Sequence, residues 1–339
     1  MVKTTQIKKG GYIVSGYSAV GKKEHEGPLG KFFHKWFEDD YLGEKSHEAA
    51  ERKLLKTAFD GAVRAAKLKF GDIDAILSGD LLNQIISASF ASRGASSAFL
   101  GVYGACSTMA LGLGLGATMT QLGAFKRVLV GVSSHFATAE RQYRLPLEQG
   151  SQRVPVAQWT ITGAGATVVS SDKPTEETGA KKSFCPRIVS ATFGRIVDPG
   201  IKDANNMGGA MAPSAADTLT QFFRNTKTAP KDFDAIFTGD LGRLGEEIMR
   251  DLCAREGFTL GAEYSDCGWL VYDSGDAVQM GGSGAGCSAI VFNSYILKKL
   301  RSGEFRRILF IATGALLSAT TALQGESIPC VAHLVEIRS

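Results

Sequence analysis

Cys106 is the side chain of this 339-residue chain best placed to act as a nucleophile. The apolar run at 98–105 predicts a strand, and the segment at 107–124 predicts a helix whose first turn begins at Cys106. A thiol at a helix N-terminus lies near unpaired backbone N–H groups and the positive end of the helix dipole, which favours the thiolate form. This spacing favours a reactive thiol in a pocket. The alternative is a small buried residue that fills the turn.

Polar side chains follow three other predicted strands. His135 lies at the sheet edge where ligands of α/β proteins bind, so it is predicted to donate to a ligand carboxylate; alternatively, it is a loop histidine satisfied locally. Asp80 and Asp240 each follow an apolar strand and could cap the next helix. Alternatively, Asp80, with Asn83 or Gln84, projects into the pocket and accepts from a protonated ligand group or helps to hold Ca²⁺.

The stretch at about 138–160 is long, irregular and charged, and it is predicted to form an inserted loop that covers the pocket. Arg141 and Arg144 suit bidentate contact with carboxylates, and Tyr143 suits stacking on an aromatic ring. These residues contact a ligand only if the loop folds back over Cys106. Otherwise they are solvated.

A glycine turn at 281–284 precedes a second predicted helix, which begins at Cys287. Its bare N–H groups can bind an anion, so Gly282 and Ser283 are candidate ligand contacts. Glycines at 112, 114 and 116 oppose helix formation in the segment after Cys106. They predict a buried helix approached closely by the backbone of the helix at Cys287.

Composition excludes several functional classes. The net charge is +4, with no basic run interleaved with aromatic residues, so no nucleic-acid partner is expected. The six cysteines form no CxxC pair and no zinc spacing, so neither a metal site nor a disulfide framework is expected. No apolar run reaches about 18 residues. A soluble cytoplasmic protein is therefore predicted.

The elements that position these residues come from a duplication. DIDAILSGDLL at 72–82 recurs as DFDAIFTGDLG at 232–242, with seven of eleven positions identical, and FKRVL at 125–129 recurs as FRRIL at 305–309. Strands alternate with helices in both units, which predicts a layered α/β fold with two mixed sheets around two central buried helices. The expected halves are 1–183, which contains the inserted loop, and 184–339. AVQMGG at 277–282 is predicted to be one strand of the second half.

This duplicated arrangement, with a cysteine opening the first central helix, resembles the thiolase and ketoacyl-synthase superfamily. The motifs GPLG, SGDLLNQ, YGACS, SSHFATAERQYR, GGAMAPSAADT, GGSGAGCSA and ATGALLSAT resemble the stage V sporulation protein AD family over nearly the whole chain. The resemblance implies a thiolase-like fold, a homodimer formed through the strand before Cys106, and binding of dipicolinic acid (pyridine-2,6-dicarboxylic acid) for loading into the developing spore. It also implies action beside other stage V sporulation membrane proteins, peripherally at the forespore membrane.

The resemblance also identifies what is missing for condensation chemistry. The positions that correspond to the partner histidine and to the partner asparagine or histidine are Gly239 and Gly282, and ATGALLSAT lacks the late cysteine of thiolases. A thiol without a base and oxyanion donors is not expected to condense acyl groups. We therefore expect a non-catalytic protein that binds dipicolinate or its calcium chelate, with no cofactor and with calcium only as part of the ligand. The alternatives are an acyl-CoA-dependent acyltransferase with divergent partners and a structural subunit of a spore membrane complex.

Overall fold

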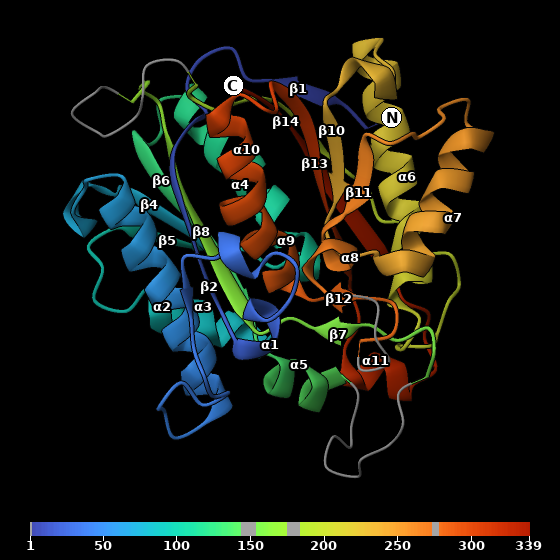
Figure 1. Ribbon diagram of the computed structural model, residues 1–339, viewed down its shortest axis with the longest axis horizontal. Helices are drawn as coiled ribbons and strands as arrows, with labels where there is room; N and C mark the ends of the chain where they lie inside the picture. Colours follow the sequence, from blue (N-terminus) through green and yellow to red (C-terminus); the bar gives the residue numbers. More distant parts are fainter. Residues whose placement is uncertain (1, 144–153, 175–183, 273–277) are drawn as a thin grey trace.

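The computed structural model describes residues 2–143, 154–174, 184–272 and 278–339, and its strands repeat one arrangement twice (Figure 1). The hydrogen-bonded strand order is β11-β10-β13-β14-β9-β2-β8-β6-β4-β5, which reads as two matching sets of five about the β9–β2 junction. In each set three strands are parallel and the next two are antiparallel. The predicted duplication is therefore confirmed in three dimensions.

The first set consists of β2 (Tyr12–Val20), β4 (Ala75–Gly79), β5 (Ala98–Gly101), β6 (Arg127–Ser134) and β8 (Gly163–Ser170). The second consists of β9 (Arg187–Phe193), β10 (Ala235–Thr238), β11 (Tyr264–Asp266), β13 (Arg307–Ala315) and β14 (Cys330–Arg338). Short strands complete the fold: β1 (Thr4–Gln6) pairs with β9, β3 (Lys35–Trp36) pairs with β2, and β7 (Trp159–Thr160) pairs with β12 (Gly282–Ser283).

The two expected sheets are joined into one path of strands. The junction is a single paired position of β2 and β9, Tyr12 opposite Arg187. The change from the first half to the second falls between the end of β8 at Ser170 and the start of β9 at Arg187. Two short strands pair across this boundary: β1, which precedes the first half, pairs with β9, and β7 of the first half pairs with β12 of the second.

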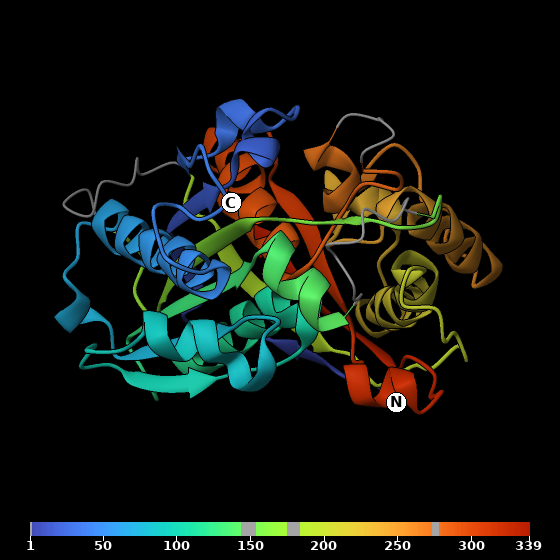
Figure 2. The same ribbon diagram turned by 90° about the horizontal axis from the view of Figure 1, so that it is seen from below.

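The helices form three layers around the two sets of strands (Figures 1 and 2). α2 (His47–Ala65) and α3 (Ile86–Ala91) cover the first set, and α6 (Met207–Thr226) and α7 (Gly242–Arg255) cover the second. α4 (Thr108–Gln121) and α9 (Ala285–Val291) lie between them, and α9 continues through a π-helical turn at Phe292–Ile296 into α10 (Leu297–Ser302). The shorter helices are α1 (Lys22–His25), α5 (Phe136–Tyr143), α8 (Cys267–Val271) and α11 (Ala319–Leu323). Buried apolar side chains fill the spaces between the layers as three separate clusters.

Local sequence signals explain where several of these elements begin. Ser46 caps α2, because its Oγ accepts from the N–H of Ala49 at 3.2 Å. β4 and β6 coincide with the apolar runs that precede Asp80 and His135 in the sequence. None of the helices that the structure describes is both long and apolar enough to cross a bilayer.

Two predictions about local structure are wrong. Most of AVQMGG is not a strand, because Gln279 and Gly281 have positive φ values of 50° and 102° that interrupt an extended chain; only Gly282 belongs to β12. The corresponding edge strand is β11 instead. The segment predicted as irregular from about 138 is helical in α5 up to Tyr143 and extended again at β7.

Glycine is needed at these positions of α4 for a different reason from the predicted one. A Cβ on Gly112 would lie 2.6 Å from Val130 Cγ1, and a Cβ on Gly114 would lie 3.0 Å from the ring of Phe193. The close neighbours are therefore side chains of both sets of strands. The close backbone approach belongs to α9 instead, because a Cβ on Gly165 of β8 would lie 2.3 Å from the Ala289 carbonyl oxygen.

Candidate functional site

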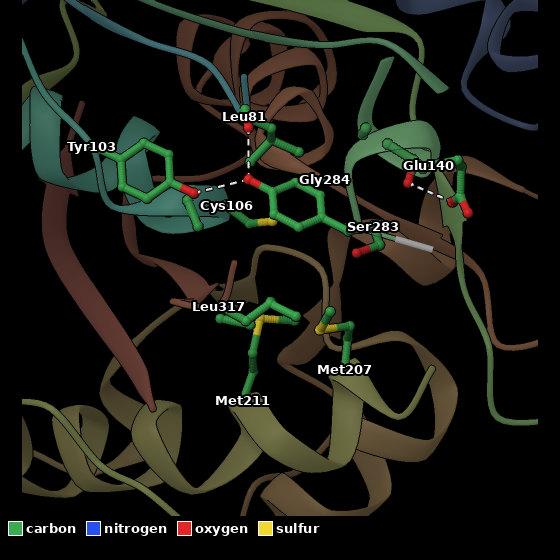
Figure 3. A pocket seen from close by; sticks show the side chains of 14 residues that line it. Leu81, Tyr103, Cys106, Glu140, Met207, Met211, Ser283, Gly284 and Leu317 are labelled. Atoms are coloured by element: carbon green, nitrogen blue, oxygen red, sulfur yellow. Dashed lines mark hydrogen bonds between the residues drawn. The ribbon is translucent and has the colours of Figure 1, made fainter. Parts of the chain in front are cut away.

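A pocket lies at the start of α4, where residues of both halves meet (Figure 3). It encloses about 460 Å³, part of it open to solvent. The wall of this Cys106 pocket consists of Leu81, Tyr103, Ala105, Cys106, Ala139, Glu140, Tyr143, Thr160, Met207, Met211, Ser283, Gly284, Ala315 and Leu317.

Cys106 occupies a tight turn between β5 and α4. Ala105 to Ser107 form a 3₁₀ turn that leads into α4 at Thr108, so the predicted place of the cysteine at a helix start is confirmed. Ala105 has a φ of 48°, a left-handed conformation that is uncommon for a residue with a Cβ. The turn is held by Ser107 Oγ, which donates to the Gly104 carbonyl oxygen at 2.6 Å. Such backbone strain persists where the surrounding structure fixes it, often at ligand sites.

Asp240 lies buried behind the pocket wall, at the end of β10. Its carboxyl group accepts from Thr313 Oγ1 at 2.7 Å, from the Gly284 N–H at 3.2 Å and from Ser283 Oγ at 3.4 Å. It also accepts from the Cys106 thiol. Burial raises the pKa of Asp240 to about 6, and these hydrogen bonds oppose the rise. The contact places a carboxyl group, as a hydrogen-bond acceptor, beside the Cys106 thiol.

Asp240 does not cap the helix that follows it, which corrects one of the two expectations. Asp266 takes this place, because its carboxyl oxygens accept from the N–H groups of Leu241 at 2.8 Å and Gly242 at 2.9 Å, where α7 begins. The sequence gives little indication that Asp266 caps α7. It lies 26 positions after Asp240, in a strand that the apolar pattern did not indicate.

The rest of the wall is mostly apolar. Met207 and Met211 extend from α6 toward the sulfur of Cys106, and Leu317 lies beside them (Figure 3). On the opposite side Glu140 accepts from Thr160 Oγ1 at 2.9 Å. Sequence reasoning missed both methionines, although the GGAMAPSAADT motif contains Met211. The described residues of the wall include one carboxylate and no lysine, arginine or histidine.

Of the predicted ligand residues, the structure places Cys106 and Ser283 on the wall of the pocket. Gly282 lies behind it, and its carbonyl oxygen accepts from Gln158 Nε2 at 2.9 Å. Asn83 lines an adjoining cavity instead. Arg144 lies outside the described residues.

His135, Asp80 and Arg141 do not line the pocket, which corrects their predicted placement. His135 is buried, with its Nε2 2.8 Å from the Asp40 carbonyl oxygen, and burial lowers its pKa. Arg141 pairs with Glu48 at 3.0 Å on the outer surface.

Asp80 is enclosed in the first half and does not line the pocket. Its carboxyl oxygens accept from the N–H groups of Leu82 at 2.8 Å and Ala88 at 2.7 Å, so it caps the first turn of α3. Its pKa is raised to about 6, mainly by burial. Glu51 of α2 is close enough to be affected by its charge, and burial together with Asp80 raises the pKa of Glu51 to about 8.

The described residues therefore provide a thiol, hydroxyl groups and a carboxyl group at the pocket. They show no group of three or more histidine, cysteine or acidic side chains suited to a metal ion. Among the described residues of the wall, none is a histidine that could face Cys106.

Comparison with known proteins finds one family that matches nearly the whole chain. Residues 2–338 match the family model described as Stage V sporulation protein AD. The Stage V sporulation protein AD of Bacillus subtilis (strain 168) is 42% identical over 322 residues, which cover 95% of this chain and 92% of that protein.

Comparison with solved structures finds proteins of similar fold. The 3-oxoacyl-[acyl-carrier-protein] synthase III from Aquifex aeolicus VF5 is similar at a TM-score of 0.57 and 14% identity, over 97% of this chain and 99% of that one. The tetronic acid condensing enzyme AbyA1 is similar at a TM-score of 0.60 and 16% identity, over 97% and 100% of the two chains. At these identities the likeness concerns the fold alone, and it confirms the predicted thiolase-like architecture.

Proposed function

This chain belongs to the stage V sporulation protein AD family, and from that premise and the Cys106 pocket we propose that it is a non-catalytic protein that binds dipicolinic acid for uptake into the developing spore. The observation that supports this proposal is the composition of the pocket. The described wall combines two tyrosine rings, two methionines and the Ser283 hydroxyl, and none of its described residues is a histidine, lysine or arginine. A flat aromatic ring with polar groups at its edge suits such a wall.

The charge of the pocket favours the calcium chelate over the bare dianion. Dipicolinate carries two carboxylates, while the described wall supplies the carboxyl group of Glu140 and is backed by that of Asp240. Bringing an uncompensated dianion beside these groups is costly, because like charges repel strongly at a partly buried site. One Ca²⁺ neutralises the ligand, and the oxygens of Glu140, Thr160 and Ser283 are of the kind that calcium prefers.

Calorimetry with dipicolinate, with and without calcium, tests this function. We expect binding that is tighter when calcium is present. A Cys106→Phe variant should lose binding, because the larger ring fills the pocket, whereas Cys185→Ser, which changes a cysteine that does not line the pocket, should bind as the parent protein does. No heat of binding in either condition would contradict the proposal.

An acyl-transferring enzyme is the second candidate, and the strained turn at Ala105 beside a cysteine is the observation that favours it. Incubation with acyl-CoA, followed by intact-mass measurement, separates the two. The binding protein forms no lasting thioester at Cys106 and releases no β-ketoacyl product. An acylated Cys106 that turns over would favour the enzyme.

The proposal includes a homodimer. β5 pairs with β4 on one side and leaves its other edge unpaired among the described strands, and Phe99 on it is 39% exposed. An exposed strand edge of this kind promotes association. Light scattering should give twice the 36.0 kDa mass of one chain. A monomer at micromolar concentration would contradict this assembly.

Family membership also supports association with the membrane proteins of the same sporulation system, peripherally at the forespore membrane. Co-purification from detergent-solubilised sporulating cells tests this part of the proposal. The expected result is recovery of at least one of these membrane proteins with this chain, and not with an unrelated protein that carries the same tag.

A further inference from the structure

A second cavity adjoins the Cys106 pocket and opens more widely to solvent. It encloses about 720 Å³, including open space, and we call it the vestibule. Its wall consists of Leu82, Asn83, Gln84, Ile85, Gly101, Tyr103, Gln142, Tyr143, Leu317 and Ser318. Tyr103, Tyr143 and Leu317 line both cavities. The two cavities are therefore neighbours, and we call these three shared residues the partition between them.

Hydrogen bonds hold the tyrosines of this partition together. The Tyr143 hydroxyl donates to the Leu81 carbonyl oxygen at 2.6 Å, so its oxygen accepts from the Tyr103 hydroxyl at 3.1 Å. Figure 3 shows Tyr103 and Leu81 on the side of the pocket away from Glu140, joined by these bonds. The described structure thus has its two rings linked across the boundary between pocket and vestibule.

The backbone around the partition is strained. Of the seven described non-glycine residues with a positive φ, three border these two cavities: Gln84 at 56°, Ile85 at 49° and Ala105 at 48°. Each such conformation is costly and persists where surrounding structure fixes it, as at ligand clamps and switch regions. The boundary between the cavities therefore has features of a functional element.

The vestibule differs from the pocket in its chemistry. It presents the side-chain amides of Asn83, Gln84 and Gln142 and the hydroxyl of Ser318. Amide N–H groups can donate to a carboxylate without adding charge, and the tyrosine rings can stack on a planar ligand. This combination suits a small aromatic carboxylate on its way to a less polar site.

We propose that the vestibule is a first binding site for planar aromatic carboxylates and that Tyr103 and Tyr143 form the gate between it and the Cys106 pocket. The identity of the ligand rests on the proposed function, whereas the gate itself rests on the partition. Opening requires the Tyr143 hydroxyl to leave the Leu81 carbonyl oxygen, which also accepts from Gln142 Nε2 at 2.9 Å. That second bond keeps the end of α5 in place while the ring moves.

Accessibility of Cys106 measures the gate without any ligand. Tyr143→Phe keeps the ring but removes both hydrogen bonds, and Tyr103→Phe removes one of them. The open state should increase by about two- to twelvefold for each bond removed, the factor that one ordinary hydrogen bond supplies. Alkylation of Cys106 by iodoacetamide and by an aromatic maleimide, followed by peptide mapping, should accelerate accordingly, more in Tyr143→Phe and more for the larger reagent.

The size dependence separates gating from altered thiol reactivity, which would change both reagents equally. Peptide mapping separates Cys106 from the partly exposed Cys185. Tyr41→Phe is the matched control, because Tyr41 is 47% exposed and lines neither cavity. Equal alkylation rates in Tyr143→Phe, Tyr103→Phe and parent protein, or an equal change for both reagents, would overturn the gate.

Dipicolinate then separates the two proposals. If dipicolinate with calcium slows alkylation of Cys106 in the parent protein, the ligand reaches the pocket, and Tyr143→Phe should bind and release it faster in stopped-flow measurements. If alkylation is gated but dipicolinate gives no protection, the gate stands and the proposed ligand is wrong. Because Tyr103 follows the edge strand proposed for dimerisation, the assembly in solution is measured first and must be the same for all variants.

Discussion

Asp80 and Asp240 occupy matching points of the duplicated sequence, yet their partners differ. Each follows the middle one of the three parallel strands of its half, β4 or β10, and burial raises the pKa of each carboxyl group to about 6. Asp80 binds backbone N–H groups of its own segment, at Leu82 and Ala88. Asp240 instead binds groups that come from β13, from the turn before α9 and from the Cys106 thiol.

The difference shows how a duplicated unit can separate structural and site roles. In the first half, Asp80 stabilises the start of α3. In the second half, Asp266 stabilises the start of α7, so Asp240 is available to support the pocket wall. The same residue at the same point of the fold therefore has a structural role in one half and a site role in the other. Four measurements can break or sharpen this comparison.

The largest expected effect is a loss of stability in Asp80→Ala. Removal of the carboxyl group leaves the buried N–H groups of Leu82 and Ala88 without their acceptors, and each unsatisfied buried donor costs about 1–3 kcal/mol. We expect the free energy of unfolding to fall by about 2–4 kcal/mol in urea titrations. Dipicolinate affinity of the folded variant should stay within about twofold, or about 0.4 kcal/mol. A tenfold weaker affinity at unchanged stability would assign Asp80 to the site.

Asp240→Ala should affect the ligand more than the fold. The hydroxyls of Thr313 and Ser283 are free to rotate, whereas the Gly284 N–H at the pocket wall has a fixed direction and loses its acceptor. We expect dipicolinate affinity with calcium to weaken roughly tenfold, or about 1.4 kcal/mol. Calorimetry of this variant beside Asp80→Ala makes the comparison direct. Unchanged affinity would contradict the site role of Asp240 and would leave both aspartates with structural roles alone.

The pH dependence of stability distinguishes the acid pair of the first half. Burial, with the nearby charge of Asp80, raises the pKa of Glu51 to about 8, so the folded state keeps a proton that the unfolded chain loses above its ordinary value near 4.5. Glu51 therefore makes stability fall as pH rises from that value to about 8. Glu51→Gln should remove up to about 1 kcal/mol per pH unit of this slope between pH 6 and 8.

Urea titrations at pH 6, 7 and 8 measure this slope. The matched control is Asp60→Asn on the same helix, whose side chain is 38% exposed and pairs with Lys56. It should leave the slope unchanged. Equal slopes in Glu51→Gln and the parent protein would show that Glu51 does not keep an extra proton in the folded state.

The smallest effect is expected for Arg141→Ala. Arg141 and Glu48 form an exposed pair, and such pairs contribute less than about 1 kcal/mol. Stability should change by less than about 0.5 kcal/mol and dipicolinate affinity by less than about twofold. A clear loss of affinity would show that α5 presents this guanidinium to the ligand in solution, and the division between the two halves would then be less strict.

Local patterns predicted much of the fold. The apolar runs marked β4, β6, β10 and β13, and the repeated DAI-x-x-GDL pattern located the duplication. These features depend on residues close together in sequence, so a single sequence contains them. The place of Cys106 at a strand-to-helix turn is local in the same way.

The polar contacts of the site were predicted less well, because their partners lie far away in the sequence. His135 bonds to Asp40, 95 positions earlier, and Gln158 bonds to Gly282, 124 positions later. A pattern of residue types does not reveal which of several distant acceptors a buried donor reaches. The same holds for Asp240, whose partners depend on Asp266 having taken the capping position.

The pairing of β1 with β9 has a consequence for synthesis of the chain. Thr4 lies opposite Thr192, so β1 leaves the ribosome 188 residues before its partner. At about 5–20 residues per second, that interval is roughly 10–40 s. During this time the first half can assemble its own strands while β1 stays unpaired. Fragments that end before β9 therefore lack a partner for their first strand, and pairing of β1 reports that β9, the first strand of the second half, is in place.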